Sequence, residues 1–438
     1  MKIPEILLVE SLHERGSLAK ILQVIADCGL VVEHMNAVRR DQDKTIWEIT
    51  LEMDADNDTG VYDRIDALPN ARFLGKSDRV FNRHEGGKIQ MIHRKDIGSL
   101  QELRDIYTPG VARVCLAIRE KPELAYKYTN LKNTVAIITN GTAILGLGDI
   151  GALAGLPVIE GKAVLMSQFA GISGIPILLD HTDPEHIIDA IMAIEQSFGA
   201  IQLEDIAGPA CFEVEEELKK RLAKPVLHDD QHGTAVVALA AMLSASKRIG
   251  RKLEDGIIGQ IGLGAAGIGI SRLAIACGAR RVMGTDLSEP ALQRLEEIGG
   301  ERASLEKLMA EADVVVATTG VPGLIKPDMV RKGQMILALS NPDPEIEPHI
   351  ALERGAAFAA DGKGINNVLG FPGLFRGALD AGATHFTDGM LWAAAKAISD
   401  LAPDDELVPG PLDKSVHEAV AKAVQEAAER KLEKKRQD

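Results

Sequence analysis

Hydrophobic and polar positions follow two different rhythms along the chain. In the first 85 residues, short runs that are apolar or alternate between apolar and polar predict strands, because successive strand side chains face opposite sides of a sheet. Apolar residues three and four positions apart predict helices between these runs. The resulting order is strand, helix, strand, strand, helix, strand. The predicted strands lie at 6–9, 31–38, 46–53 and 73–74, and the predicted helices at 18–25 and 62–68.

After a polar, glycine-containing linker at 82–88, strands alternate with longer helical stretches. Such repeating strand and helix units predict parallel sheets with helices on both faces. The chain should end in a charged amphipathic helix whose polar face is solvated. The predicted strands lie at 135–139, 176–179, 257–261, 281–285, 314–317 and 335–339, and the last helix at 415–435.

These patterns predict an α/β protein with several domains, as a length of 438 residues allows. A ferredoxin-like βαββαβ module at 1–85 is followed by an α/β domain at 89–247. A doubly wound α/β domain at 248–390 and a helical segment at 391–438 complete the chain.

Composition narrows the class of function. Hydrophobic residues make up 46% and charged residues 26% of the chain, as in soluble globular proteins. A net charge of −15 argues against a protein that binds nucleic acid or anionic membranes. The four cysteines are far apart, and no apolar run reaches the length of about 18 residues that spans a bilayer. We expect a soluble cytoplasmic protein that acts on small molecules and contacts other subunits.

A glycine-rich turn follows the predicted strand at 257–261. Gly262, Gly264 and Gly267 form a GxGxxG pattern that opens a helix, and Asp286 ends the next strand, 19 residues after Gly267. Such glycines let a pyrophosphate approach the helix N-terminus, and the acid accepts the adenosine ribose hydroxyls. Asp286 would repel a 2′-phosphate, so the pattern favours NAD over NADP in a Rossmann-type domain. The predicted cofactor-binding residues are Gly262, Gly264, Ala265, Ala266, Gly267 and Asp286.

A second GxGxxG match occurs at 146–151, also after a strand. Asp149 and the residues that follow suit a phosphate-binding helix poorly. We interpret this match as a packed turn near the site, with a second nucleotide site as the rival interpretation.

Two pairs of acids stand at the ends of short apolar strands. Glu204 and Asp205 follow one strand, and Asp229 and Asp230 follow the next. The carboxyl ends of parallel strands meet at one edge of a sheet, so these oxygens predict a site for Mg²⁺ or Mn²⁺. Both acids of the first pair reach one ion only if the strand ends there. The rival interpretation is solvated or helix-capping acids.

His228 and His232 have the four-residue spacing of a zinc-binding helix. Gly233 follows at once, however, and no glutamate stands next to the first histidine. A capped turn, or a role in support of the metal-binding acids, is the better interpretation.

Eight sequence blocks follow one another between about 90 and 400: YTPGVA at 107–112, GLGDIG at 146–151, EGKA at 160–163, LED at 203–205, DDQHGTA at 229–235, the loop at 262–267, SNP at 340–342 and NNVLGFPG at 366–373. This ordered set resembles the malic enzyme family. The order of elements in the first 75 residues, with Arg15-Gly16-Ser17-Leu18 at the first helix, resembles the ACT family of regulatory modules.

The resemblance implies a role for individual residues. It makes Tyr107 the acid that protonates the enol product and Lys162 the base toward the substrate hydroxyl. Asp229 becomes a relay or supporting carboxylate. It also implies the metal ligands Glu204, Asp205 and Asp230, and contacts to nicotinamide and substrate from Asn341, Asn366 and Asn367.

The implied reaction is the NAD-dependent, metal-dependent oxidative decarboxylation of malate to pyruvate and CO₂ in a homodimer or larger homo-oligomer. A metal ion stabilises the enolate, and a lysine accepts a proton only when its pKa is lowered. One departure concerns the arginine that grips a malate carboxylate in larger family members, because Ala143 stands there. Arg113 or main-chain amides could take over that role.

Two other functions remain open. A malolactic-type enzyme would keep its NAD and release lactate, and a non-catalytic sensor would bind both ligands without turnover. For the ACT-like segment, a small effector such as an amino acid competes with a plain dimerisation role.

Overall fold

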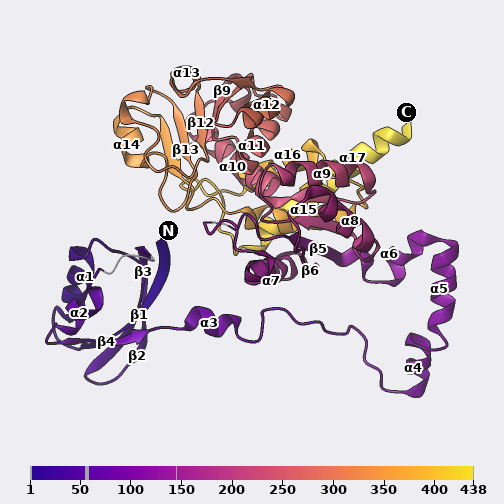
Figure 1. Ribbon diagram of the computed structural model, residues 1–438, viewed down its shortest axis with the longest axis horizontal. Coiled ribbons are helices and arrows are strands. Elements are labelled where there is room, and N and C mark those ends of the chain that lie inside the picture. Colours follow the sequence, from indigo (N-terminus) through magenta and orange to yellow (C-terminus); the bar gives the residue numbers. More distant parts are fainter. Residues whose placement is uncertain (1, 55–58, 145, 438) are drawn as a thin grey trace. The chain divides into compact units, whose positions relative to one another are not determined.

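The computed structural model describes residues 2–54, 59–144 and 146–437 (Figure 1). The chain divides into two compact units, Met1–Lys88 and Ile89–Asp438. Each unit is described by itself below.

The first unit is an antiparallel sheet with two helices on one face. The strand order in the sheet is β2-β3-β1-β4. Leu7, Ile49 and Leu51 of the sheet pack against Ile21 and Ile25, which recur at helical spacing on α1. This unit therefore has a hydrophobic core of its own. Its elements are β1 (Lys2–Leu12), α1 (Ser17–Asp27), β2 (Val31–Arg40), β3 (Lys44–Asp54), α2 (Val61–Asp66), β4 (Ala71–Lys76) and the short helix α3 (Arg79–His84).

The second unit begins with a segment that buries little. Residues 89–99 form no helix or strand, and neither α4 (Leu100–Ile106) nor α5 (Val111–Glu120) buries a residue. Apolar side chains are nevertheless frequent here, including Met91 at 90% exposure and Ile92 at 77%. We call residues 89–120 the arm. Three short elements follow: η1 (Pro122–Leu124), α6 (Ala125–Tyr128) and η2 (Leu131–Asn133).

The first sheet of this unit is parallel, as the alternation of strands and helices predicts. Its order is β6-β5-β7-β8. Every residue of β5 and of β7 is buried. The strands are β5 (Thr134–Thr139), β6 (Ser173–Leu178), β7 (Ala200–Leu203) and β8 (Val226–His228), and the helices are α7 (Ala152–Ala170), α8 (Pro184–Ile194), η3 (Glu195–Ser197), α9 (Ala210–Arg221) and α10 (Asp229–Arg248).

The second sheet is a six-stranded parallel sheet in the order β11-β10-β9-β12-β13-β14. From β9 the chain adds β10 and β11 on one side of the sheet, and then crosses over to add β12, β13 and β14 on the other side. Ligands bind at such a switch point, here between β9 and β12, in open α/β sheets. Its strands are β9 (Ile257–Ile261), β10 (Arg281–Thr285), β11 (Glu301–Arg302), β12 (Val314–Ala317), β13 (Met335–Ala338) and β14 (Phe358–Asp361), and its helices are η4 (Leu253–Asp255), α11 (Ala265–Ala276), α12 (Glu289–Glu297), α13 (Leu305–Glu311), η5 (Pro327–Met329) and α14 (Pro348–Glu353).

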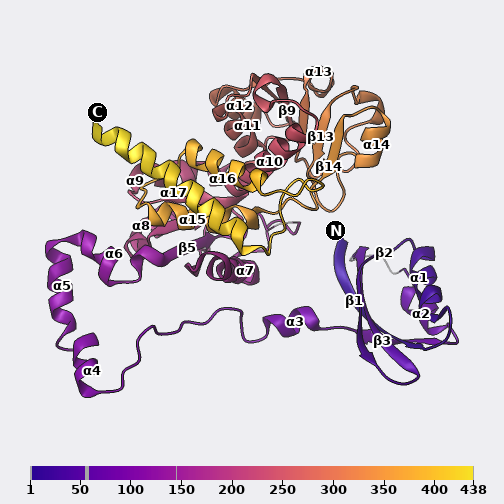
Figure 2. The ribbon, with the colours of Figure 1, turned by 180° about the vertical axis from the view of Figure 1, so that it is seen from behind.

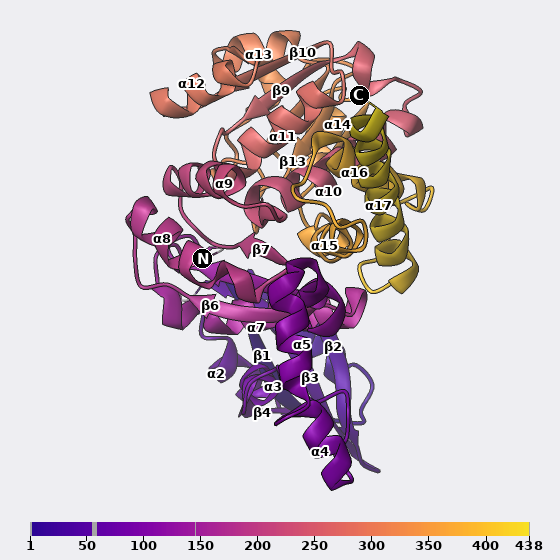
Figure 3. The ribbon, with the colours of Figure 1, turned by 90° about the vertical axis from the view of Figure 1, so that its right-hand side faces the viewer.

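Helix α10 connects the two sheets. Fifteen of its 20 residues are buried, and one core cluster takes in Val135 of β5, Val237 of α10 and Val316 of β12. Figure 3 shows α10 between the strands of the two sheets. One continuous core therefore holds both sheets of this unit.

The last helices cover the same core. In Figure 2, α17 runs alongside α15 and α16. Its buried Val416, Val420 and Val424 lie one turn apart, so the predicted charged helix has an apolar inner face. None of the helices in the described part of the chain combines the length and apolar character that a membrane span needs. The remaining elements are η6 (Asn367–Leu369), α15 (Phe371–Asp380), α16 (Asp388–Asp400) and α17 (Lys414–Gln437).

Candidate active site

Three acids meet at the carboxyl ends of β7 and β8. Glu204 and Asp205 follow β7, and Asp230 lies in the first turn of α10, directly after β8. One carboxylate oxygen from each lies within 4.8 Å of the others. The first two are buried and the third is half-buried. The structure thus brings the three predicted metal ligands together.

A turn in the backbone lets two consecutive acids reach one point. The ladder continues one residue past β7, since the Glu204 N–H donates to the Ile138 carbonyl at 2.8 Å. Asp205 then adopts a left-handed conformation with φ of 52°, which is uncommon for a residue other than glycine. Its N–H donates to the Asp230 carboxylate at 3.0 Å. The strand ends where both acids can share an ion.

Lys162 points into this group of acids from α7. It is only 8% exposed, and its Nζ atom lies 2.9 Å from a Glu204 oxygen and also contacts the Asp229 carboxylate. The ring of Phe371 lies beneath the ammonium group, with its centroid 4.5 Å from Nζ. Burial alone would lower the pKa of Lys162, but the carboxylates of Asp229 and Glu204 outweigh it and raise the pKa above its ordinary value.

The acids carry more negative charge than Lys162 balances. Burial raises the pKa of Glu204, and burial together with Asp230 raises the pKa of Asp205 to about 7. Oδ2 of Asp205 and Oδ1 of Asp229 are buried and accept no hydrogen bond from any residue that the structure describes. Unpaired buried carboxylate oxygens are costly unless a cation or proton compensates them. This donor set, all oxygen and rich in charge, fits Mg²⁺ or Mn²⁺.

Asp229 connects the acids to a distant loop. Its Oδ2 atom accepts hydrogen bonds from Lys162 and, at 2.7 Å, from Nδ2 of Asn367. A Cβ atom at Gly233 would lie 1.9 Å from Oδ1 of Asp229, so only glycine leaves room for the carboxylate against the helix. The neighbouring Asn366 points elsewhere, because its side chain accepts from the Val368 N–H and caps η6.

Behind the acids, Glu215 of α9 holds the start of α10. Its buried carboxylate accepts from the His228 backbone N–H at 2.9 Å and lies 3.0 Å from Nε2 of His232. Lys219 Nζ lies 2.8 Å from the same carboxylate. His228 itself lies 3.2 Å from a carboxylate oxygen of Asp230. Neither histidine belongs to the ligand cluster found in the described part of the chain, so both support the acids.

The glycine-rich turn between β9 and α11 has the expected geometry. Gly262 has φ of 86°, and a Cβ at Gly267 would lie 1.9 Å from the Gly262 carbonyl oxygen. No side chain caps α11, whose first residues are Ala265 and Ala266, and a Cβ at Gly264 would meet no atom within 4 Å. An open cradle at a helix N-terminus fits a dinucleotide pyrophosphate.

Asp286 lies at the end of β10 beside this turn. Its carboxylate accepts from the Leu263 N–H at 2.7 Å and the Ser288 N–H at 2.8 Å. Asn341 follows β13, is exposed, and donates to the Gly362 carbonyl at 3.4 Å. Both residues thus stand at carboxyl ends of the second sheet, where a dinucleotide lies in this fold.

Tyr107 is not joined to these residues within one chain. It lies between α4 and α5 of the arm, is 69% exposed, and no hydrogen bond or ion pair among the described residues connects its side chain to Lys162. Arg113 is exposed on α5 of the same arm. Ala143 lies near the acids, but its N–H already donates to the Asp205 carbonyl at 3.0 Å.

The second glycine match is not the packed turn that was expected, because residues 146–150 are all exposed. The N–H groups of Leu147 and Gly148 donate to the Ile144 carbonyl, and Ile150 donates to Gly141. A Cβ at Gly141 would lie 2.3 Å from the Gly151 backbone. With these amides engaged internally, the turn does not offer a phosphate cradle.

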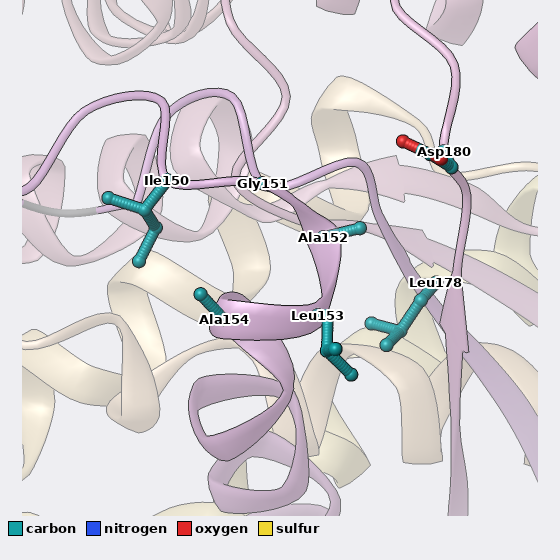
Figure 4. A pocket seen from close by; sticks show the side chains of 7 residues that line it. All are labelled: Ile150, Gly151, Ala152, Leu153, Ala154, Leu178 and Asp180. Carbon is teal, nitrogen blue, oxygen red and sulfur yellow. The ribbon is translucent and has the colours of Figure 1, made fainter.

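A pocket of about 550 Å³ opens at the N-terminal end of α7 (Figure 4). Its lining is apolar except for Asp180, so it suits an apolar group better than a dicarboxylate. The lining residues are Ile150, Gly151, Ala152, Leu153, Ala154, Leu178 and Asp180.

Sequence reasoning missed three residues that support the site. Phe371 was part of a recognised block but gave no sign that it would lie under Lys162. Glu215 lies in the acidic run EVEEE, which is typical of a solvated helix face. Glu345 is a fully buried acid in the loop after β13. No spacing in a single sequence distinguishes such acids from exposed ones.

Comparisons with known proteins agree with this geometry. The family model described as "Malic enzyme, N-terminal domain" matches residues 87–219, and "Malic enzyme, NAD binding domain" matches residues 285–429. The chain is similar to NAD-dependent malic enzyme 1 of Bacillus subtilis, with 52% identity over 96% of this chain and 97% of that protein.

Two further relatives show the same pattern. The NAD-dependent malic enzyme of Geobacillus stearothermophilus is 40% identical over 94% of this chain and 92% of its own. The crystal structure of malic enzyme from Pyrococcus horikoshii matches with a TM-score of 0.76 and 37% identity, over 81% of this chain and 90% of that one.

Proposed function

The chain belongs to the malic enzyme family, and we propose that it catalyses the oxidative decarboxylation of malate to pyruvate and CO₂ with reduction of NAD. One observation carries this proposal: Lys162 lies against Glu204 at the edge of a three-acid cluster in the same unit as a dinucleotide cradle. Four free cysteines, which stay reduced in the cytoplasm, support a reaction in that compartment.

Lys162 is the proposed base that takes the C2 hydroxyl proton of malate. Glu204, Asp205 and Asp230 would hold a divalent cation, whose positive charge would favour loss of the C2 hydroxyl proton and the enolate left when CO₂ departs. A cation bound by these acids would also offset their negative charge, which raises the pKa of Lys162. Asp229, which touches Lys162 and Asn367, is placed to orient the lysine.

NAD bound in the dinucleotide cradle would supply a nicotinamide ring that can take the hydride from C2 of malate. Asp286 accepts the Leu263 N–H of the glycine-rich turn and would accept ribose hydroxyls, which favours NAD over its 2′-phosphorylated form. Asn341, at the end of β13, is the proposed contact to the nicotinamide, and Asn367 to the substrate side.

Tyr107 is the proposed acid that protonates C3, and we propose that it acts in the site of a second copy of the chain. The arm that carries it buries no residue on α4 or α5 and exposes Met91 and Leu100 at 90% and 76%. Exposed apolar groups in series mark a surface that another protein covers. A homodimer that covers the arm would bring Tyr107 to the partner's lysine.

The arm also offers a replacement for the arginine that Ala143 lacks. The N–H of Ala143 donates to Asp205, and the N–H of Thr142 donates to Asn140 Oδ1, so neither amide is free to bind a carboxylate. Arg113, six residues after Tyr107 on the arm, is therefore the proposed anchor. Arg113 would reach the site of the second copy together with Tyr107.

A steady-state assay tests the main proposal. Malate, NAD and Mn²⁺ should together give NADH and pyruvate in equal amounts, with much lower kcat/KM for NADP. Lactate without net NADH would indicate a malolactic-type enzyme instead. Binding of malate and NAD without any turnover would indicate a sensor.

The first unit is proposed to be an ACT-like regulatory module. Its order β1-α1-β2-β3-α2-β4 and the sheet order β2-β3-β1-β4 support this, since ferredoxin-like modules of this kind often pair and bind small effectors. A plain dimerisation role is the alternative. Removal of residues 1–85 should abolish activation or inhibition by a panel of amino acids, and a deletion that alters neither kinetics nor assembly would refute both roles.

A further inference from the structure

Glu345 is a fully buried carboxylate in the loop between β13 and α14. Its Oε1 atom accepts from the Thr319 N–H at 2.6 Å, from the Thr319 hydroxyl at 2.8 Å and from the Ser340 hydroxyl at 2.5 Å. The Ser340 hydroxyl in turn accepts from the Gly320 N–H at 2.8 Å. One side chain thus bonds to two separate loops.

These two loops flank the place where a dinucleotide crosses the second sheet. Thr319 follows β12 and Ser340 follows β13, and β12 and β13 are neighbouring parallel strands. Their carboxyl ends therefore lie side by side at the binding edge of the sheet. Glu345 joins the two loops behind that edge.

Each loop continues into a residue that faces the cofactor site. A Cβ atom at Gly262 would lie 3.0 Å from the Thr319 side chain and 2.9 Å from the Thr318 carbonyl, so the β12 loop packs on the glycine-rich turn. On the other side, Ser340 precedes Asn341, whose exposed side chain is the proposed nicotinamide contact. A shift of the β13 loop would therefore move Asn341 at the nicotinamide end of the site, whereas the glycine-rich turn keeps its own bonds to Gln260 and Asp286.

A buried carboxylate that only joined two loops would cost more free energy than a neutral side chain in the same place. Burial of a charge costs free energy unless every oxygen is well bonded. Here the charged acceptor gives short bonds, which fix geometry more tightly than neutral ones do. We propose that Glu345 is a positioning residue that fixes the β12 and β13 loops for the nicotinamide half of NAD, an inference that rests on the proposed NAD site.

The test compares two ligands that share one end. NADH spans the whole site, whereas ADP reaches only the glycine-rich turn and Asp286, which have bonds of their own. Glu345→Ala should raise the Kd of NADH about tenfold, close to 1.4 kcal/mol, and change the Kd of ADP less than twofold. Glu345→Gln should have a smaller effect, because its carbonyl oxygen can still accept. Binding is measured by NADH fluorescence and by calorimetry for ADP.

Glu347→Ala is the matched control, because Glu347 is exposed two residues away and its side chain does not cap α14. Both Kd values should stay at the wild-type level. The inference is overturned if Glu345→Ala leaves NADH binding unchanged, or if NADH and ADP weaken by the same factor. Should that variant not fold, Ser340→Ala is expected to show a threefold difference between the ligands, and no difference would be equally decisive. Failure of the wild-type chain to bind NADH would instead refute the proposed function.

Discussion

The Nζ atom of Lys162 lies 2.9 Å from Oε1 of Glu204, so the proposed base contacts a proposed metal ligand. Replacement of Lys162 by alanine should lower kcat by at least about 100-fold, the usual contribution of a general base. Binding of NAD should persist, because the lysine lies on α7 and the cofactor cradle on α11. Steady-state rates and a fluorescence titration with NADH measure both. Lys220→Ala is the control, because Lys220 is exposed on the surface of α9. Near-normal turnover in Lys162→Ala would show that Lys162 is not the base.

The placement of Tyr107 predicts complementation between two inactive variants. In a mixed dimer of Lys162→Ala and Tyr107→Phe chains, a tyrosine that acts on the partner leaves one of the two sites with both groups intact. Activity should return to about half the wild-type value per dimer, the fraction of intact sites that symmetry gives. Two affinity tags allow the mixed dimer to be purified and assayed. Mixed dimers as inactive as their parents would place Tyr107 in its own chain's site.

Asp286→Ser should reduce the preference for NAD over NADP. The substitution removes a negative charge from the ribose site, and also the acceptor for the Leu263 N–H at 2.7 Å. We expect the ratio of kcat/KM for NAD to that for NADP to fall at least about tenfold, or 1.4 kcal/mol. Kinetics with both cofactors measure this ratio. An unchanged ratio would mean that another residue excludes the 2′-phosphate.

Glu215→Gln should weaken metal binding although Glu215 is no ligand. Burial alone would raise the pKa of Glu215, but His232 and Lys219 outweigh it and hold the pKa well below its ordinary value. The carboxylate is therefore charged where it fixes the start of α10. Loss of such outer partners typically costs 10- to 100-fold in metal affinity, so we expect the Kd of Mn²⁺ to rise about tenfold.

Electron paramagnetic resonance of free Mn²⁺ measures that Kd directly. Glu216→Gln is the control, since Glu216 is the exposed neighbour on the same helix. Equal Mn²⁺ affinity in the Glu215 and Glu216 variants would contradict the supporting role.

We expect the protein to lose stability in mild acid because of the buried side chain of His417. Its ring stacks on Phe169 with centroids 4.2 Å apart, and burial lowers its pKa in spite of the Pro411 carbonyl and Asp413. Below about pH 6.5 the unfolded chain therefore binds a proton that the folded chain resists, and the free energy of unfolding falls. Above that pH, protonation of His417 makes no contribution to the free energy of unfolding.

Melting temperatures of the wild type and His417→Gln at pH 7.5 and 5.5 isolate this effect, because other titrating groups are common to both chains. The stability advantage of the wild type should shrink at pH 5.5. An advantage of the same size at both values would show that His417 does not titrate in this range.

Much of the second unit follows from the sequence. The strands Ile257–Ile261 and Arg281–Thr285 have the predicted bounds, because buried parallel strands leave short apolar runs between helices. The acid cluster was predictable from two acid pairs at strand ends, given parallel topology. The left-handed turn at Asp205 that makes it work leaves no mark in the sequence.

Other features depend on long-range contacts that one sequence does not encode visibly. The family resemblance gives Tyr107 a role at the substrate, yet Tyr107 lies on an exposed arm, and no pattern of apolar residues in the sequence marks that placement. Glu215 and Glu345 resemble ordinary surface acids until the fold buries them. Residues 85–99 form no regular element although strands and helices were expected to alternate from residue 89.

The separate core of the first unit affects the order in which the chain can fold during synthesis. Leu7 to Ile65 complete that core by themselves, so this unit can fold while the ribosome still makes the remainder. The second unit cannot complete its core so early, because Val135 of β5 shares its core with Val424 of α17, which is made much later. Until α17 emerges, the nascent chain carries a finished first unit and an unfinished second one, whose uncovered apolar surface is the part most prone to aggregation.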